Sequence, residues 1–197
     1  MFLLYEELPR NVDLSGVKYE LNLAFDSVLY ALKAISDPDL TDKDKLESFL
    51  NILIIGHLPS EDVWLDLYDQ VINLLSDASP ETAVPTDLNG NPIKIKSNQP
   101  NIKTYDSDFD AQMIYAAFKQ AYGIDLIDQQ GKLHWYKYQA LLNALPENTM
   151  FYQVRNIRNT NLSDIKDKEQ RHTMAKLKEQ VALPDEYVEK EGDMSGS

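Results

Sequence analysis

Cysteine is absent from the sequence, and histidine is scarce. Without cysteine the 197 residues can form no disulfide bond, thiolate metal site or cysteine nucleophile. The three histidines, His57, His134 and His172, stand far apart, and none has another histidine three or four residues away to share a metal ion on a helix. We therefore expect neither a bound metal ion nor a cofactor.

The sequence also lacks the glycine-rich and apolar segments that mark several large protein classes. The stretch Gly123 to Lys132 has seven residues between its glycines where a phosphate-binding loop has four, and Leu133 replaces the required Ser or Thr. A Gly-x-Ser-x-Gly motif, typical of a nucleophilic serine, is missing. No apolar run approaches the roughly 20 residues of a membrane helix, and the first residues do not resemble a signal peptide. We expect an intracellular protein that is not an enzyme.

Basic residues are outnumbered, with 19 Lys and Arg against 32 Asp and Glu, a net charge of −13. Binding to a polyanion needs a local surplus of cations, so this balance argues against a general nucleic-acid binder. Residues 155–180 reverse the balance, because four acidic side chains there meet seven basic ones: Arg155, Arg158, Lys166, Lys168, Arg171, Lys176 and Lys178. This basic segment predicts a surface for a charged partner or for the acidic body of a second copy. A solvated helix with internal ion pairs is the alternative.

The periodicity of the apolar residues predicts a mainly α protein with a small β element. Two alternating runs around Ser15-Gly16 predict an N-terminal β-hairpin. Apolar residues at helical spacing, with Ser, Thr or Asp at the starts and Gly or Pro at the ends, predict helices. The expected helices cover residues 22–36, 41–55, 60–74, 110–122, 132–145, 149–158 and 161–183.

Four prolines and an Asn-Gly pair interrupt the helical pattern between residues 79 and 106. We interpret this stretch as a connector between two helical halves, in which PIKIK could add a short strand. The first half, residues 1–78, carries the hairpin, and the second covers residues 107–183. Residues 184–197 predict a disordered acidic tail. The whole is expected to form one compact multi-helix domain.

The segment GKLHWYKYQALLNAL, residues 131–145, raises three hypotheses because it mixes aromatic rings with lysines. Such a mixture can grip single-stranded nucleic acid, line a small-molecule site, or belong to a core helix. On a helix its apolar side chains cover most of the circumference, which is typical of a central helix contacted from several sides. We therefore expect core aromatics and a buried His134 with a hydrogen-bond partner.

A partner-binding surface is predicted at Trp64 and Tyr68, which lie one helical turn apart. They flank the apolar stripe of their helix rather than belonging to it. The two rings could bind an apolar helix of a partner by helix-in-groove contact. Packing against the N-terminal hairpin is the alternative.

The stretch from Tyr105 to Leu145 contains an acidic-aromatic entry, an Ile-Tyr-Ala-Ala-Phe helix, the run YGIDL, and Leu-His-Trp before an aromatic helix. In these elements it resembles the bacteriophage gene-product-fifteen family of tailed phages that infect Gram-positive bacteria. The opening LPRNVDLSGVKYELNLAFDSVL and the basic IKDKEQRHTMAKLKEQVAL resemble the same family. Tyr136 departs from it, where a second Trp is common, and so does Ala24, where an Asp is usual. The signature side chains, expected in the core, are Phe109, Tyr115, Phe118, Tyr122, Gly123, Leu133, His134 and Trp135.

The resemblance implies a tail assembly chaperone of a long-tailed phage or prophage. Such a protein binds the long helical tape measure protein, helps recruit the major tail protein to the growing tube, and then leaves. It implies a homo-oligomer in the host bacterial cytoplasm, with no catalytic residues. A structural tail completion or connector protein that stays in the virion is the first alternative, and a nucleic-acid binder acting through residues 155–180 is the second.

Overall fold

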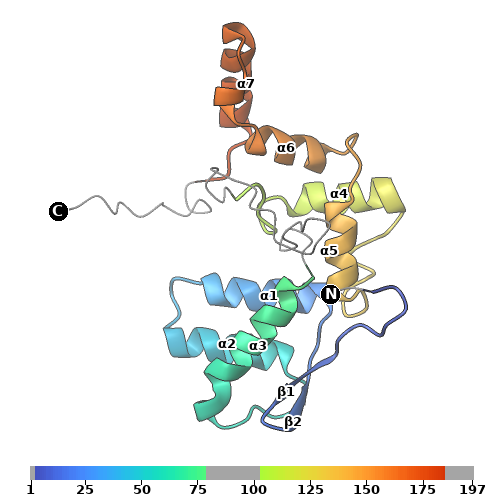
Figure 1. Cartoon of the computed structure of the whole chain (residues 1–197), viewed down its shortest axis with the longest axis vertical. Helices are drawn as coiled ribbons and strands as arrows, with labels where there is room; N and C mark the ends of the chain where they lie inside the picture. The colour runs from blue at the N-terminus through green and yellow to red at the C-terminus, as the bar shows by residue number, and fades with distance from the viewer. Residues whose placement is uncertain (1–2, 79–102, 185–197) are drawn as a thin grey trace, which may run out of the picture. The chain divides into compact units, whose positions relative to one another are not determined.

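The computed structural model describes residues 3–78 and 103–184, which form two compact units (Figure 1). Unit 1 contains residues 3–78 and 125–144, and unit 2 contains residues 103–124 and 145–184. The expected mainly α fold with a small N-terminal hairpin is confirmed. The PIKIK strand, most of the connector and the acidic tail lie outside the described residues.

The hairpin of unit 1 consists of β1 (Asn11–Leu14) and β2 (Val17–Glu20), paired antiparallel with Val12 opposite Tyr19. Ser15 and Gly16 both have positive φ, 54° and 83°, which is the backbone shape of the tight turns that suit the twist of two strands. The Asp13 carboxylate accepts a hydrogen bond from the Gly16 amide and fixes this turn. A bridge between Leu21 and Ile54 extends the pairing beyond β2.

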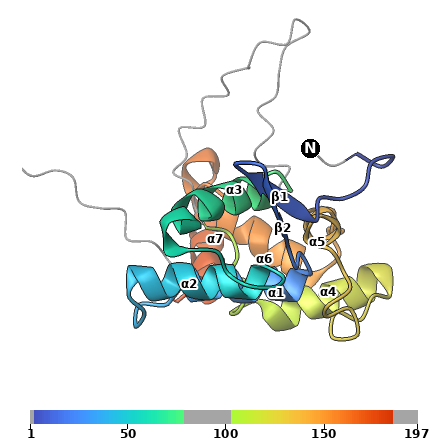
Figure 2. The same ribbon diagram turned by 90° about the horizontal axis from the view of Figure 1, so that it is seen from below.

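Three helices complete the N-terminal part of unit 1. Helices α1 (Phe25–Ser36) and α2 (Asp42–Leu53) lie side by side, and α3 (Trp64–Ser76) packs against α2 and β1 (Figure 2). The predicted cap of α2 is confirmed, because the Thr41 hydroxyl accepts a hydrogen bond from the Asp44 amide. The predicted start of the third helix at Ser60 is wrong. A short 3₁₀ turn, η1 (Glu61–Val63), comes first, and the Ser60 side chain caps nothing.

Residues 125–144 complete unit 1, although the sequence pattern grouped them with the C-terminal half. They contain α5 (Trp135–Asn143), which is shorter than the expected helix over 132–145. The backbone on either side of the start of α5 pairs with the chain before α1. Phe25 donates its amide hydrogen to the Leu133 carbonyl, and Trp135 donates to the Leu23 carbonyl. These bonds hold α5 against the N-terminal elements.

Unit 2 contains α4 (Ala111–Tyr122), α6 (Met150–Asn159), the 3₁₀ turn η3 (Leu162–Asp164) and α7 (Lys168–Gln180). The predicted end of α4 is confirmed, because Gly123 has a φ of 68°. The last helix was expected from residue 161, but α7 begins only at Lys168, where the Asp167 carboxylate caps it. No residue of α7 is buried. No helix among the described residues is long and apolar enough to cross a membrane.

Candidate functional site

The aromatic residues at the start of α5 close the C-terminal end of α3. The indole nitrogen of Trp135 donates a hydrogen bond to the Leu75 carbonyl at 3.1 Å, and the Tyr136 hydroxyl donates to the Leu74 carbonyl at 2.7 Å. The last carbonyls of a helix lack an amide partner in a following helical turn. Tyr136 supplies a donor to the Leu74 carbonyl, and Trp135 adds one to the Leu75 carbonyl, which also accepts from the backbone amide of Ala78. Burial, and then the nearby Asp77 carboxylate, raises the pKa of Tyr136 to about 12. The hydroxyl therefore keeps its proton and remains a donor.

His134 is the N-cap of α5 rather than a residue inside the helix, which corrects the predicted helical position. Its Nδ1 accepts a hydrogen bond from the Tyr136 amide at 3.1 Å, so the ring proton belongs on Nε2. Nε2 then donates to the Pro9 carbonyl at 2.9 Å. Burial lowers the pKa of His134, and this outweighs the bond to Pro9, which raises it. Burial therefore favours the neutral form of the half-buried imidazole, and the two hydrogen bonds fix the orientation of its ring.

The rings of α5 face the interior of unit 1 and are not available to stack on nucleic-acid bases. Trp135, Tyr136 and Tyr138 are all buried. The Tyr138 ring stacks on Phe25 with centroids 4.9 Å apart and on Trp135 at 5.7 Å. The expected core role of this segment is confirmed.

The remaining signature residues divide between core and surface. Phe118, Leu133 and Trp135 are buried, and Tyr115, Tyr122 and His134 are half-buried. Two residues contradict the expected core position. Gly123 lies exposed at the left-handed end of α4, and Phe109 is 47% exposed, because its ring covers the guanidinium of Arg158 at 5.9 Å instead of entering the core.

The rings of Trp64 and Tyr68 pack within unit 1. Trp64 is buried, and its indole nitrogen donates to the Pro59 carbonyl at 3.0 Å. Tyr68 is half-buried and meets the Phe49 ring edge-on, with centroids 5.0 Å apart. Because α3 also packs against β1, this face of the helix is largely occupied by the chain itself. A role of these two rings in partner binding stays a prediction.

Arg158, predicted at a basic surface, instead joins four segments in the interior of unit 2. Its guanidinium forms a two-point ion pair with Asp110, at 2.6 and 3.0 Å, and both side chains are nearly inaccessible. The same guanidinium donates to the carbonyls of Thr104 and Val181. A buried guanidinium with all these acceptors fixes α4, α6, the chain before α4 and the chain after α7 together.

Two further members of the basic segment also have partners inside unit 2. Arg155 donates to the Thr104 hydroxyl at 3.2 Å and lies over the Tyr105 ring. Lys178 donates to the Thr160 carbonyl at 2.6 Å. The basic side chains that remain exposed are Lys166, Lys168, Arg171 and Lys176, against Asp164, Asp167, Glu169 and Glu179. Three of the seven basic side chains of residues 155–180 therefore make contacts inside unit 2. The exposed side chains of this segment carry equal numbers of positive and negative charges.

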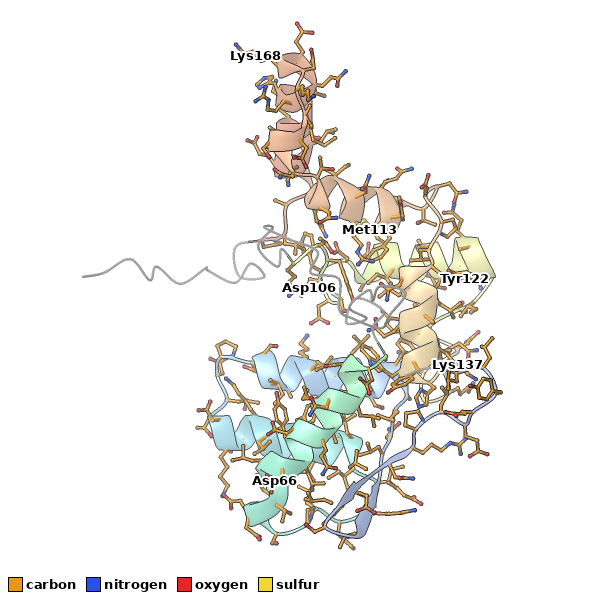
Figure 3. The ribbon with its side chains drawn as sticks, in the orientation of Figure 1. Asp66, Asp106, Met113, Tyr122, Lys137 and Lys168 are labelled. Atoms are coloured by element: carbon orange, nitrogen blue, oxygen red, sulfur yellow. The ribbon has the colours of Figure 1, made fainter. Side chains whose placement is uncertain are left out.

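Sequence reasoning missed a second surface, on the opposite side of α3 from its core stripe. We define the outer face of α3 as Leu65, Asp66, Asp69, Asn73 and Ser76, all of which are exposed (Figure 3 labels Asp66). Leu65 is 68% exposed. A helical projection of the sequence alone could have found this face, because these positions lie opposite Leu67, Val71 and Leu75.

The described residues hold no group of three His, Asp or Glu side chains placed to bind a metal ion. Every buried side-chain nitrogen or oxygen in the described part of the chain has a hydrogen-bond partner.

A family model described as Bacteriophage Gp15 protein matches residues 4–183, which include the described part of both units almost completely. No curated protein and no solved structure matches the chain.

Proposed function

The chain belongs to the Bacteriophage Gp15 protein family, and from this membership we propose that it is a tail assembly chaperone. The family identifies a bacteriophage structural or assembly protein. In the proposed role the chain binds the tape measure protein and assists assembly of the tail tube. The family match over residues 4–183 is the observation that carries the proposal.

The distribution of charge and apolar side chains supports this role. A chaperone for a long helical client needs apolar contacts for the client and enough net charge to keep the complex in solution. The described residues of unit 1 include seventeen acidic and seven basic side chains. Apolar side chains are exposed among them, notably Leu4, Tyr5, Tyr30 and Leu65. Unit 1 thus combines strong negative charge with accessible apolar groups.

The remaining parts of the proposal concern partners and place of action. We propose that the chain forms homo-oligomers on its client, contacts the major tail protein during tube assembly, and acts in the host bacterial cytoplasm. The balanced exposed charge of residues 161–180 speaks against the alternative of a nucleic-acid binder, which would need a cationic surplus at the surface.

Co-expression with the tape measure protein tests the proposal. We expect the tape measure protein, expressed alone, to be insoluble, and to become soluble and co-purify with the chain when both are made. A tape measure protein that stays insoluble and does not co-purify would contradict the chaperone role.

Mass spectrometry of purified virions separates the chaperone from a retained tail component. A chaperone leaves before the tail is complete, so its peptides should be absent from particles in which the major tail protein is abundant. Stoichiometric recovery of the chain from the particles would instead identify a structural component.

A further inference from the structure

We propose that the outer face of α3 docks a cationic amphipathic helix of the client. This inference rests on the proposed chaperone function, because it names the chemistry of the client segment and the surface that receives it. The face is distinct from Trp64 and Tyr68, which point toward the core of unit 1.

The first observation is an apolar side chain within an acidic surface. Leu65 is 68% exposed, and Asp69 lies four residues on, one turn along the same face of the helix. Asp66 lies three residues before Asp69 and flanks Leu65 at the edge of that face. Asp62, in the turn before α3, extends the acidic stretch at its N-terminal end and is also exposed. A partner that covers Leu65 must therefore approach between carboxylates.

The second observation is that no basic side chain of the helix pairs with these carboxylates. Residues 61–76 contain no basic side chain, and no ion pair or side-chain hydrogen bond reaches Asp62, Asp66 or Asp69 in the described part of the chain. Like charges three or four residues apart destabilise a helix slightly. An exposed face that keeps this repulsion gains most from a partner with opposite charge.

The third observation is the rigidity of the support behind the face. The opposite side of α3 carries Leu67 and Val71, both fully buried, and the helix packs against α2 and β1. Trp135 and Tyr136 hold its last turn. The outer face is therefore presented without a cost in ordering the receptor, which favours binding.

Charge complementarity and the helical spacing define the occupant. Lysine or arginine side chains at a spacing of three to four residues can reach Asp62, Asp66 and Asp69, and an apolar side chain between them can cover Leu65. Glutamate or aspartate at the same positions would be repelled. The occupant is thus a helix with a mixed cationic and apolar face.

Fluorescence anisotropy with the full chain tests this inference. The probe is a fluorescein-labelled 20-residue peptide of Lys, Leu and Ala in an amphipathic helical pattern, and its counterpart has Glu at every Lys position. We expect the Lys peptide to bind at least about tenfold more tightly than the Glu peptide, and its Kd to rise with salt because exposed charges are screened.

Substitutions on the face and a matched control locate the site. Asp66→Asn/Asp69→Asn should weaken binding of the Lys peptide about fivefold to tenfold, the effect of two partly exposed ion pairs. Leu65→Ala should weaken it several-fold by loss of apolar contact. The control Glu6→Gln/Glu7→Gln removes the same charge from exposed positions of unit 1 and should change the Kd less than about twofold.

Each outcome decides between the possibilities. Equal weakening by the face variant and by the control would mean a general effect of net charge and would overturn the docking site. Loss of self-association in sedimentation velocity, with unchanged peptide binding, would assign the face to a second copy and overturn the inference.

If Asp66→Asn/Asp69→Asn still co-purifies fully with the tape measure protein, the chaperone role stands and the site fails. If the wild type binds the Lys peptide but not the tape measure protein, the proposed function fails.

Discussion

Helices α5 and α7 differ in how many of their side chains are buried, although the sequence of each suggested a binding surface. The nine residues of α5 bury five side chains, among them three aromatic rings, whereas the thirteen residues of α7 bury none. Yet both segments offered combinations of residues that suggest binding, aromatics with lysines in α5 and a basic surplus around α7. In both regions many of these side chains make contacts within the protein instead. Those of α5 cap α3, and Arg155, Arg158 and Lys178 bind partners inside unit 2.

Removal of the Trp135 side chain should destabilise the protein far more than removal of an apolar side chain from α7. Trp135→Ala leaves a cavity and removes the indole donor to the Leu75 carbonyl, so we expect the free energy of unfolding to fall by about 3–5 kcal/mol. The counterpart in α7, Leu177→Ala, should cost less, about 1–2 kcal/mol, because the Leu177 side chain is 36% exposed and loses only part of the free energy of full burial. Urea unfolding of both variants measures the difference, and similar losses would contradict the described packing.

Removal of the Arg158 side chain should destabilise unit 2, because this side chain joins α6 to the start of α4 and to the chain after α7. Arg158→Ala leaves Asp110 as a buried charge without its partner, which we expect to cost about 3–5 kcal/mol in thermal or urea unfolding. Arg171→Ala, at an exposed position of α7, should change stability by no more than about 0.5 kcal/mol. The double variant Arg158→Met/Asp110→Leu should recover much of the loss, since it removes both charges together. Failure of the double variant to recover any stability would argue against the ion pair as the cause.

The hydrogen bond from Tyr136 to the end of α3 should make a smaller contribution to stability. Tyr136→Phe keeps the ring and removes the donor to the Leu74 carbonyl, so we expect a loss of about 1 kcal/mol. Tyr136→Trp, which restores an N–H donor, should lose less than Tyr136→Phe if the hydrogen bond matters. An equal or greater loss in the tryptophan variant would indicate that ring shape dominates instead.

The neutral cap at His134 predicts a dependence of stability on pH. Because burial lowers the pKa of His134 in the fold, the unfolded chain takes up a proton first when the pH falls below about 6.5. The stability contributed by the neutral ring is therefore complete above that pH and is lost as the pH falls toward the lowered pKa. Protonation also removes the Nδ1 acceptor of the Tyr136 amide.

His134→Asn tests this smallest effect. Asparagine can accept the amide hydrogen bond as an N-cap but does not titrate in this range. Near neutral pH the unfolding midpoints of the wild type and the variant should change with pH to the same extent. Between pH 5 and 6.5 the midpoint of the wild type should fall more steeply than that of the variant. Parallel profiles would assign the pH dependence to other groups.

The elements that sequence alone predicted are those fixed by local chemistry. The Ser15-Gly16 turn, the Thr41 cap and the Gly123 end of α4 each depend on residues within a few positions of one another. The starts of α5 and α7 were misplaced, in the first case because histidine is not among the common N-cap residues. The cap of α7 by Asp167 was available in the sequence and could have been identified.

The contacts that could not be predicted join residues far apart in the chain. Trp135 meets Leu75 and Arg158 meets Asp110 across 60 and 48 positions. A helical projection reports which side of a helix is apolar, but it does not report which distant segment covers that side. For the same reason the sequence assigned Arg158 to a surface, since arginine carries no sign of burial until its carboxylate partner is located.

The membership of residues 125–144 in unit 1 has a consequence for the order of events during translation. A ribosome adds about 5–20 residues per second, so the strands and the first three helices emerge several seconds before the segment that closes α3. Through that interval the nascent chain exposes the apolar surface that Trp135, Tyr136 and Tyr138 later cover. For a few seconds of its own synthesis, the N-terminal part of unit 1 is therefore a surface to which other apolar chains can bind.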